Sequence, residues 1–337
     1  MYEISQEQIS NIPDNPHIQG AFFKAIGNLD QHKKMVVSVS EGSDSDIVVD
    51  FMHQCGMSHK VDYVFFDTGI EYQATYDHLD YLEDRYGIYI QRERAYKSIP
   101  MCCKEYGVPF MSKYTSEMIK RMQDAGFQFE DGSYSDLSRD YPDLKSGLRW
   151  WCNEYPGNSL FNINRKRLLK EFLMEHPPKY KISNKCCHYS KKITAHQYNV
   201  KNDIDVVIIG LRKSEGGIRG AIKQCYVPKS GNMPDKYYPI FWLTDSDKTV
   251  YNKFYKIKNS DCYSKYGLNR TGCVCCPYGL ECGREREAAR IYEPKLYRLT
   301  ERVFGKSYDY TRFFYEFRGK HDIEVKRGNT KLLDCWL

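Results

Sequence analysis

The sequence predicts an α/β fold, a mostly parallel sheet flanked by helices, with a small C-terminal module rich in cysteine. Short apolar runs recur along the first two thirds of the chain, and each ends in a turn that helical patterning follows. Five of the thirteen cysteines crowd into the late stretch CYSKYGLNRTGCVCCPYGLECG. Strands that alternate with helices form parallel sheets, which bind ligands at the carboxyl ends of their strands.

The individual elements follow from these runs. After a helical lead-in over residues 1–30, the segment KKMVVSVS predicts a first strand, SEGSDSD a turn and DIVVDFMHQCG a helix. VDYVFFDTG predicts a second strand and EYQATYDHLDYLEDRYG its helix, while IYIQRERA and DVVIIG predict two more strands. Residues 97–178, rich in Tyr, Lys and Trp, show no clear periodicity.

The composition limits where the protein can be located and which partners it can bind. A chain of 337 residues with 41% hydrophobic residues can bury a large core. No run approaches the roughly 18 apolar residues of a membrane helix, and the N-terminus is too polar for a signal peptide, so we expect a cytoplasmic protein without membrane contact. The net charge of +6 mildly favours anionic partners, although an ordinary solvated surface explains it equally well. An odd number of cysteines in an unsecreted chain favours metal ligation over disulfides.

The turn from Ser40 to Ser45 is the first candidate site. It lies between a predicted strand and a predicted helix, where backbone N–H groups and the helix dipole suit phosphate or sulfate oxygens. A turn of this composition can equally be a helix cap formed by Asp44 or Ser45. The turn alone leaves both interpretations open.

Four segments together resemble a known family. SVSEGSDSD resembles the pyrophosphate-binding (PP) loop of the N-type ATP pyrophosphatase superfamily, S-G-G-K-D-S, and DTGIEYQATYDHLDYL resembles the D-T-G-x-x-x-x-E-T-Y signature of its phosphoadenylyl-sulfate (PAPS) reductase branch. GLRKSE with the following Arg219 resembles G-x-R-x-x-E-S-x-x-R, and YPIFWLTDSDKTVY resembles P-I-x-x-W-x-x-x-D-V-x-x-Y. The order of the four segments, from about Met35 to Pro277, implies the adenine nucleotide alpha hydrolase-like fold.

The resemblance implies an adenine-nucleotide site, a PP-loop domain over residues 31–255 and a cluster-binding and helical region over residues 256–337. Arginine suits such a site because its planar fork binds phosphate or sulfate bidentately. Asp44, Arg212 and Cys335 are the implied catalytic residues. The implied nucleotide-binding residues are Ser38, Ser40, Gly42, Ser43, Asp44, Ser45, Asp67, Thr68, Gly69, Gly210, Arg212, Glu215 and Arg219.

The loop departs from the family pattern at two positions. Glu41 stands where the pattern has Gly, and Ser43 stands where it commonly has Lys. A carboxylate repels bound phosphate, and a side chain at Glu41 crowds a backbone that must approach the ligand. The missing lysine argues against ATP α,β-cleavage, whereas the sulfonucleotide-reductase branch tolerates loops without it.

The cysteine spacing also resembles a family pattern. Cys186 and Cys187 are adjacent, and Cys273 and Cys276 form a distant C-x-x-C. This arrangement resembles the [4Fe–4S] ligand set of adenylyl-sulfate reductases, and thiolates are the ligands that such clusters require. A four-cysteine zinc site is the alternative. Other cysteines are candidates to replace one ligand, namely Cys262, Cys275 and Cys282, while Cys102 and Cys103 are expected to be buried thiols.

Three functions fit these features. In the first, ATP, with Mg²⁺ as a further candidate cofactor, drives sulfur transfer to a nucleic-acid or small-molecule acceptor, with a sulfur donor such as a cysteine desulfurase. Nucleic acid would then meet the stretch with Trp150, Trp151, Arg165 and Arg167, although such aromatic residues are more often core. The second is an adenylyl-sulfate or PAPS reductase that uses Cys335, although the tail DCWL differs from the family's E-C-G-[LI]-H. The third is a non-catalytic nucleotide sensor, which the loop departures favour.

Overall fold

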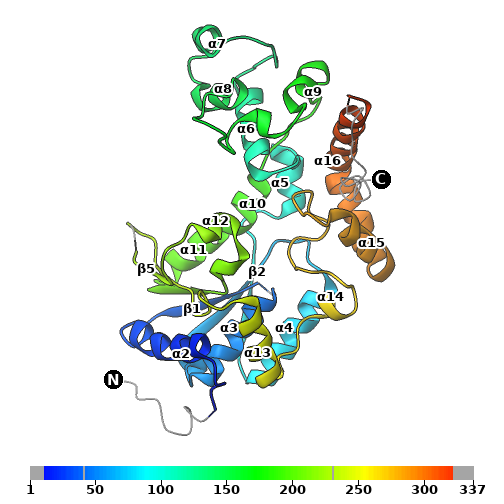
Figure 1. The fold of residues 1–337 in the computed structure, drawn as a ribbon. Helices are drawn as coiled ribbons and strands as arrows, with labels where there is room; N and C mark the ends of the chain where they lie inside the picture. Colours follow the sequence, from blue (N-terminus) through cyan, green and yellow to red (C-terminus); the bar gives the residue numbers. More distant parts are fainter. Residues whose placement is uncertain (1–10, 41, 230, 322–337) are drawn as a thin grey trace. The chain divides into compact units, whose positions relative to one another are not determined.

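The structure is a computed structural model that describes residues 11–40, 42–229 and 231–321. The chain forms two compact units, each built from two stretches of sequence (Figure 1). The sheet unit comprises residues 1–96 and 190–273, and the helical unit comprises residues 97–189 and 274–337. The continuous boundaries expected from the sequence, 1–30, 31–255 and 256–337, stay a prediction.

A six-stranded sheet forms the centre of the sheet unit. Its order is β3-β2-β1-β4-β6-β5, and all neighbours are parallel except the pair β5 and β6. The predicted fold class is thereby confirmed, and the four predicted strands are β1 to β4. The sequence did not predict β5 and β6, which have only two and three residues. The strands are β1 Met35–Val39, β2 Val61–Asp67, β3 Ile90–Arg94, β4 Val206–Ile209, β5 Tyr226–Val227 and β6 Asp235–Tyr237.

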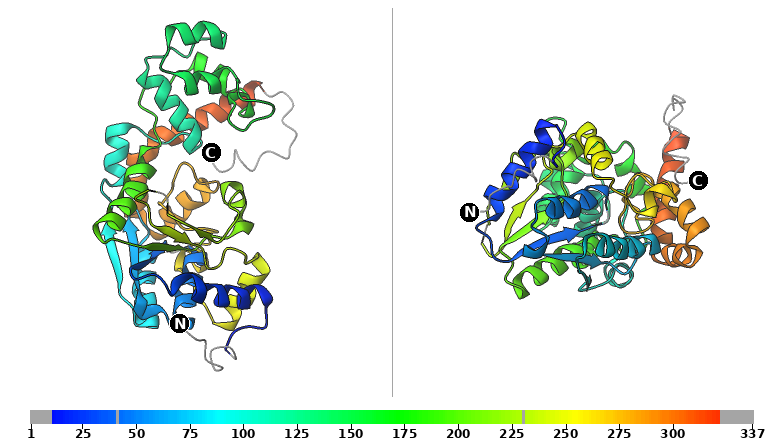
Figure 2. Two further views of the ribbon diagram at one scale, coloured as in Figure 1. Left: turned by 90° about the vertical axis from the view of Figure 1, so that its left-hand side faces the viewer. Right: turned by 90° about the horizontal axis from the view of Figure 1, so that it is seen from below.

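Helices cover both faces of this sheet (Figure 1, Figure 2). Side chains alternate across a strand, so Val37 and Val39 of β1 join one apolar cluster while Val36 joins another on the opposite face. The cluster of Val37 includes residues of α2 Pro16–Leu29, α3 Ser43–Gln54, α4 Gln73–Tyr86 and α13 Asp245–Phe254. The cluster of Val36 includes Tyr198 of α11 Thr194–Lys201. Two short helices complete the unit, α12 Gly217–Gly220 and α14 Asp261–Ser264.

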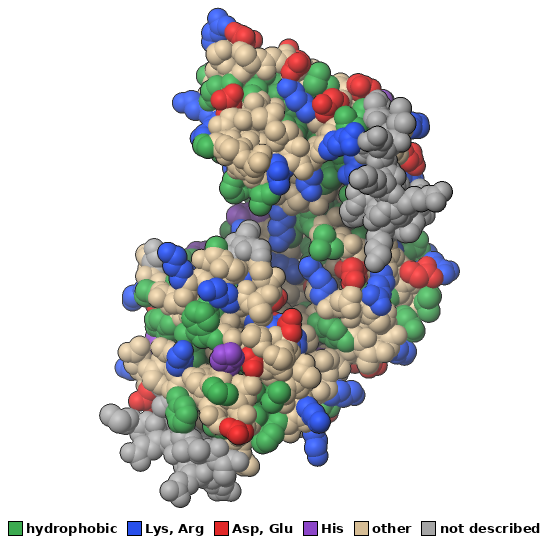
Figure 3. Space-filling view, in the orientation of Figure 1, with side chains coloured by type: hydrophobic (Ala, Val, Ile, Leu, Met, Phe, Trp, Pro, Cys, Tyr) green, Lys and Arg blue, Asp and Glu red, His purple; other side chains and the backbone are tan. Residues whose placement is uncertain are grey.

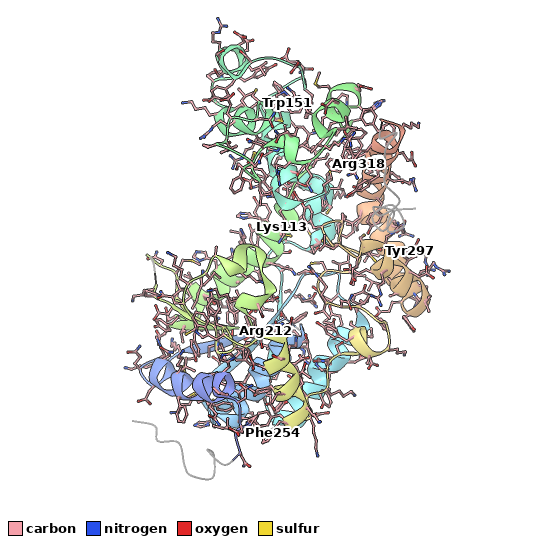
Figure 4. All side chains as sticks on the ribbon, viewed as in Figure 1. Lys113, Trp151, Arg212, Phe254, Tyr297 and Arg318 are labelled. Atoms are coloured by element: carbon pink, nitrogen blue, oxygen red, sulfur yellow. The ribbon has the colours of Figure 1, made fainter. Side chains whose placement is uncertain are left out.

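The helical unit has its own aromatic core. Trp150 and Trp151 are fully buried, and the Trp151 indole donates a hydrogen bond to the Glu130 carbonyl at 2.9 Å (Figure 4). The idea that these two tryptophans stack on nucleic acid is therefore wrong, and they are core residues. The unit's helices are α5 Ile99–Tyr106, α6 Lys113–Asp124, α7 Tyr134–Asp140, α8 Lys145–Trp151, α9 Leu169–Glu175, α10 Lys185–Cys187, α15 Cys282–Tyr292 and α16 Pro294–His321.

The surface mixes charges of both signs. Figure 3 shows Lys and Arg side chains interspersed with Asp and Glu side chains on each unit. Such mixing fits the modest net charge of +6 and an ordinary solvated surface. Among the described helices, none is both long enough and apolar enough to cross a membrane.

Candidate functional site

The turn after β1 forms the N-terminal end of α3. The N-cap residue is Gly42, which supplies no side chain to cap the helix. The Ser40 amide donates to Ser45 Oγ at 2.9 Å, and the Ser43 amide donates to the Tyr263 hydroxyl at 3.0 Å. A helix N-terminus of this kind attracts anions through its dipole and its backbone N–H groups. Glu41 lies outside the described residues.

Gly210, the first residue of the GLRKSE motif, packs against this turn. It follows β4, which pairs with β1. A Cβ atom on Gly210 would lie 2.7 Å from the Asp44 carbonyl oxygen and 2.9 Å from the Ser45 nitrogen. Only glycine permits this close backbone approach, so Gly210 fixes the neighbouring Arg212 beside the first turn of α3.

Asp44 is the centre of a charged cluster. Its carboxylate accepts hydrogen bonds from Arg212 Nε at 2.9 Å and from Lys248 Nζ at 2.6 Å. Arg212, which is 6% exposed, also donates from Nη1 to Asp245 Oδ1 at 2.7 Å. Burial opposes the charge of Arg212, but Asp245 and Asp44 outweigh it and raise the pKa of the guanidinium above its ordinary value. The predicted catalytic pair Asp44 and Arg212 thus lies together, while a contact of either residue with a nucleotide stays a prediction.

Glu215 and Arg219, which belong to the same motif, also form polar contacts within the sheet unit. Glu215 Oε2 accepts a hydrogen bond from the Arg212 backbone N–H at 3.2 Å. Its other carboxylate oxygen forms an ion pair with Arg219, whose side chain is half exposed. Arg219 therefore lies at the surface of the unit, and its predicted contact with an anionic ligand is untested.

The end of β2 forms a second turn. Asp67 Oδ1 accepts a hydrogen bond from the Gly69 amide at 2.7 Å, and Gly69 has the positive φ of 81° that favours glycine. Thr68 is buried, donates to Glu71 Oε1 at 2.5 Å and lies 3.8 Å from Cys273 Sγ. Burial raises the pKa of Glu71, although the positive charge of Lys191 acts in the opposite direction.

A cavity of about 530 Å³ lies beside these two turns, within the sheet unit. Apolar side chains from the face of the sheet that carries α11 line its floor, among them Val36, Val64 and Val207. Polar groups from the predicted site also line it, namely Ser38 and Ser40. Sequence reasoning missed the further polar lining residues Glu71, Lys191, Lys192, His196 and Asn199. The signal for Lys191, Lys192 and His196 was a basic segment, KKITAHQ, ahead of β4, whereas Glu71 lies within the DTGIEYQ motif.

Four thiols gather in the helical unit around Cys186, which is 3% exposed. A hydrogen bond with Cys103 raises the pKa of Cys186, one with Cys187 lowers it, and burial and the negative charge of Cys276 raise it further. The predicted ligands Cys186 and Cys187 thus contact each other, with the unpredicted Cys103 beside them, and Cys276 is near enough to act on Cys186 electrostatically. Their binding of a metal stays a prediction. Cys103 is buried as expected, but nothing in its sequence context showed this neighbour.

The other cysteines are divided between the units. Cys273 is the last residue of the sheet unit. Cys275 uses its carbonyl to accept hydrogen bonds from the Tyr308 hydroxyl at 2.6 Å and from Cys282 Sγ at 3.6 Å, so Cys282 supports the backbone of Cys275. Cys262 is buried in α14. Within the described ranges no group of three or more His, Cys, Asp or Glu is placed as a metal site, and Cys335 lies beyond those ranges.

The mostly parallel sheet, its flanking helices and the turns at the strand ends define an α/β protein of the predicted fold class. Residues 34–125 match the family described as the phosphoadenosine phosphosulfate reductase domain. This match covers the first two of the four segments in which the sequence resembles that family.

Several known proteins are similar to this chain. The uncharacterized protein MJ0066 of Methanocaldococcus jannaschii is 26% identical over 303 residues, which are 88% of this chain but only 45% of that protein. The chain thus spans less than half of the length of this relative. A solved PAPS reductase from Candida auris in a phosphate complex is 13% identical, with 81% of this chain and 97% of that chain covered and a TM-score of 0.40. The U34-tRNA thiolase NcsA from Methanococcus maripaludis with its [4Fe-4S] cluster is 13% identical, with 94% and 87% covered and a TM-score of 0.36.

Proposed function

We propose that the sheet unit binds an adenine nucleotide in the cavity at the carboxyl ends of β1, β2 and β4. One observation carries the proposal: a cavity of about 530 Å³ combines an apolar floor with polar groups and reaches Ser40 of the loop before α3. This volume and this mixture of side chains are typical of small-molecule sites. The family match over residues 34–125 includes both the loop and β2, and supports the same location.

The residues of the site then take distinct roles. The base would lie on the apolar floor, and the phosphates would bind at the N-terminus of α3, where the helix dipole and the backbone N–H groups favour negative charge. Arg212 would orient the phosphates through its guanidinium while it holds Asp44. The Asp44 carboxylate also suits Mg²⁺, which prefers oxygen ligands and substrate phosphates.

The helical unit would hold a [4Fe–4S] cluster through Cys186, Cys187 and Cys276. The gathering of these thiols around the buried Cys186 supports the proposal, because iron–sulfur clusters take thiolate ligands in sites screened from water. The cluster would supply a centre at which sulfur can bind. Metal analysis after anaerobic preparation tests this directly: iron with sulfide supports the cluster, and zinc without iron contradicts it.

The reaction that we propose is ATP-dependent sulfur transfer in the cytoplasm. An oxygen of the acceptor attacks the α-phosphorus of ATP, and pyrophosphate leaves. The terminal sulfur of a persulfide, supplied by a donor such as a cysteine desulfurase, then displaces AMP, which carries the acceptor oxygen away. A thiol reductant cleaves the resulting disulfide and leaves the sulfur on the acceptor. The acceptor would be a nucleic acid or a small molecule, and incubation with and without cellular RNA distinguishes the two.

Product analysis separates the three candidate functions. The anaerobically prepared protein is incubated with ATP and a persulfide sulfur donor, with and without cellular RNA, and separately with adenylyl sulfate and a thiol reductant. Pyrophosphate and AMP from ATP support sulfur transfer, whereas sulfite and AMP from adenylyl sulfate support a reductase. Neither product, in a protein that binds nucleotide, supports the sensor, and the variant Glu41→Gly then tests whether the loop departure alone prevents turnover.

A further inference from the structure

The loop before α3 lacks a cation of its own. Ser43 stands where the PP-loop pattern commonly has lysine. The structure places another lysine there: Lys248 Nζ donates to Ser43 Oγ at 2.5 Å and to Asp44 Oδ1 at 2.6 Å. An ammonium group therefore lies at the first turn of α3, although it comes from a position 204 residues along the chain.

The sequence motif around Lys248 departs from its family pattern at the same place. In the segment that resembles P-I-x-x-W-x-x-x-D-V-x-x-Y, the Asp and the Tyr of the pattern correspond to Asp247 and Tyr251. Lys248 occupies the position of the pattern's Val. The chain thus lacks a lysine at one position of the site and has an additional one at another.

The structure holds Lys248 firmly in this position. Asp247 Oδ2 accepts a hydrogen bond from the Thr244 amide at 2.8 Å and caps α13. One turn beyond Lys248, the Tyr251 hydroxyl donates to Asp50 Oδ2 of α3 at 2.8 Å, and both residues are fully buried. These contacts tie α13 to α3, so little conformational entropy would be lost when the ammonium group meets a ligand.

The Lys248 side chain is 18% exposed, so it is accessible from outside. Lys248 and Arg212 both pair with Asp44, which balances their charge in part. An incoming anion at the α3 N-terminus would meet two cations and the helix dipole together. This arrangement suits a pyrophosphate group, with its several negative charges, better than a single phosphate.

We propose that Lys248 replaces the missing loop lysine and binds the β- and γ-phosphates of the nucleotide, so that this site is built for ATP. The proposal rests on the nucleotide site proposed above. The missing lysine at Ser43 argued against ATP cleavage. Lys248 answers this argument, because its side chain brings a positive charge to the loop from another part of the chain.

Calorimetric titration of the full chain with ATP, AMP and inorganic pyrophosphate tests the proposal. Lys248→Val should weaken ATP and pyrophosphate binding about 10- to 100-fold, the loss expected when a hydrogen bond to a charged group is removed. AMP binding should change by less than about threefold, because AMP lacks the phosphates concerned. The double variant Ser43→Lys with Lys248→Val should recover most of the ATP affinity. Lys253→Val, at an exposed position of the same helix, is the matched control.

The outcomes separate this inference from the proposed function. If the wild-type protein binds no adenine nucleotide, the proposed site and this inference both fall. If it binds AMP or adenylyl sulfate but neither ATP nor pyrophosphate, or if Lys248→Val lowers ATP and AMP affinity equally, only the role of Lys248 is overturned. If Lys248→Val does not fold, Lys248→Gln removes the charge while keeping a hydrogen-bond donor. A lower ratio of ATP affinity to AMP affinity than in the wild type then supports the role of Lys248, and an unchanged ratio overturns it.

Discussion

The sheet unit and the helical unit bring their candidate ligand groups together by different means. In the sheet unit the turns after β1, β2 and β4 meet because parallel neighbouring strands end at the same edge of the sheet. In the helical unit the thiols of Cys103, Cys186 and Cys276 come from three separate segments that only side-chain packing brings together. Backbone topology therefore builds the first site, and packing of the core builds the second.

The largest effect should come from Cys186, at the centre of the thiol group. Cys186→Ala should abolish iron binding in anaerobically prepared protein, because it removes the central buried ligand of the proposed cluster. Iron per chain is the measurement. Cys152→Ala, whose thiol contacts the Gly132 carbonyl in the same unit, is the control and should keep its iron. Full iron content in Cys186→Ala would contradict the proposed ligand set.

Trp151 tests the dependence of the helical unit on its core. Trp151→Ala should lower the free energy of unfolding of this unit by about 3–5 kcal/mol, the cost of deleting a large buried aromatic side chain. Urea denaturation followed by circular dichroism measures it. Trp242→Ala, at a site that is 41% exposed in the sheet unit, should cost less than about 1 kcal/mol. Equal losses in the two variants would contradict the assignment of Trp151 to the core of the helical unit.

Gly210 provides the corresponding test for the sheet unit. Gly210→Ala should cost about 1–3 kcal/mol, because its Cβ would lie 2.7 Å from the Asp44 carbonyl oxygen and force the backbones apart. The same variant should weaken nucleotide binding, since it displaces the first turn of α3. Gly20→Ala, in the open middle of α2, should instead stabilise the protein slightly. Thermal unfolding measures both effects, and an unchanged stability of Gly210→Ala would contradict the role of the close approach between Gly210 and the Asp44 backbone.

The smallest effect concerns Glu71 and depends on pH. Burial raises the pKa of Glu71, so the folded state favours its neutral form. The associated stability is present below the ordinary pKa and is lost as the pH rises through the folded-state pKa. Glu71→Gln should therefore raise Tm at pH 8 and change it little at pH 4. Glu154→Gln, at an exposed position, should show no such pH dependence, and a flat Tm difference for Glu71→Gln would contradict the assignment.

Sequence reasoning succeeded where local patterns control the structure. Strands β1, β2 and β4 were predicted because their apolar runs end in recognisable turns, and the places of Ser40 before a helix and of Ser43 at its start followed from the same pattern. The proximity of Gly210 and Arg212 to the loop follows from the pairing of β4 with β1. These features depend on backbone geometry, which short stretches of sequence encode.

The failures concern contacts between distant segments. Trp150 and Trp151 were candidates for nucleic-acid stacking because composition reveals the residue type but not its burial. Lys248 and Cys103 were missed because their neighbours, Asp44 and Cys186, lie far along the chain and no local pattern announces such contacts. Both contacts depend on how whole helices pack.

The pairing of β1 with β4 also has a consequence for synthesis on the ribosome. Met35 lies opposite Val206, so β2, β3 and the whole first segment of the helical unit, residues 97–189, separate the two central strands in the sequence. At about 5–20 residues per second, a nascent chain carries the loop before α3 for roughly 10 to 30 seconds before β4 and Gly210 are made. During that interval β1 has an unpaired edge, and such edges invite association with other chains. Chaperone capture of the nascent chain should therefore be strongest after β3 emerges and should end once β4 does.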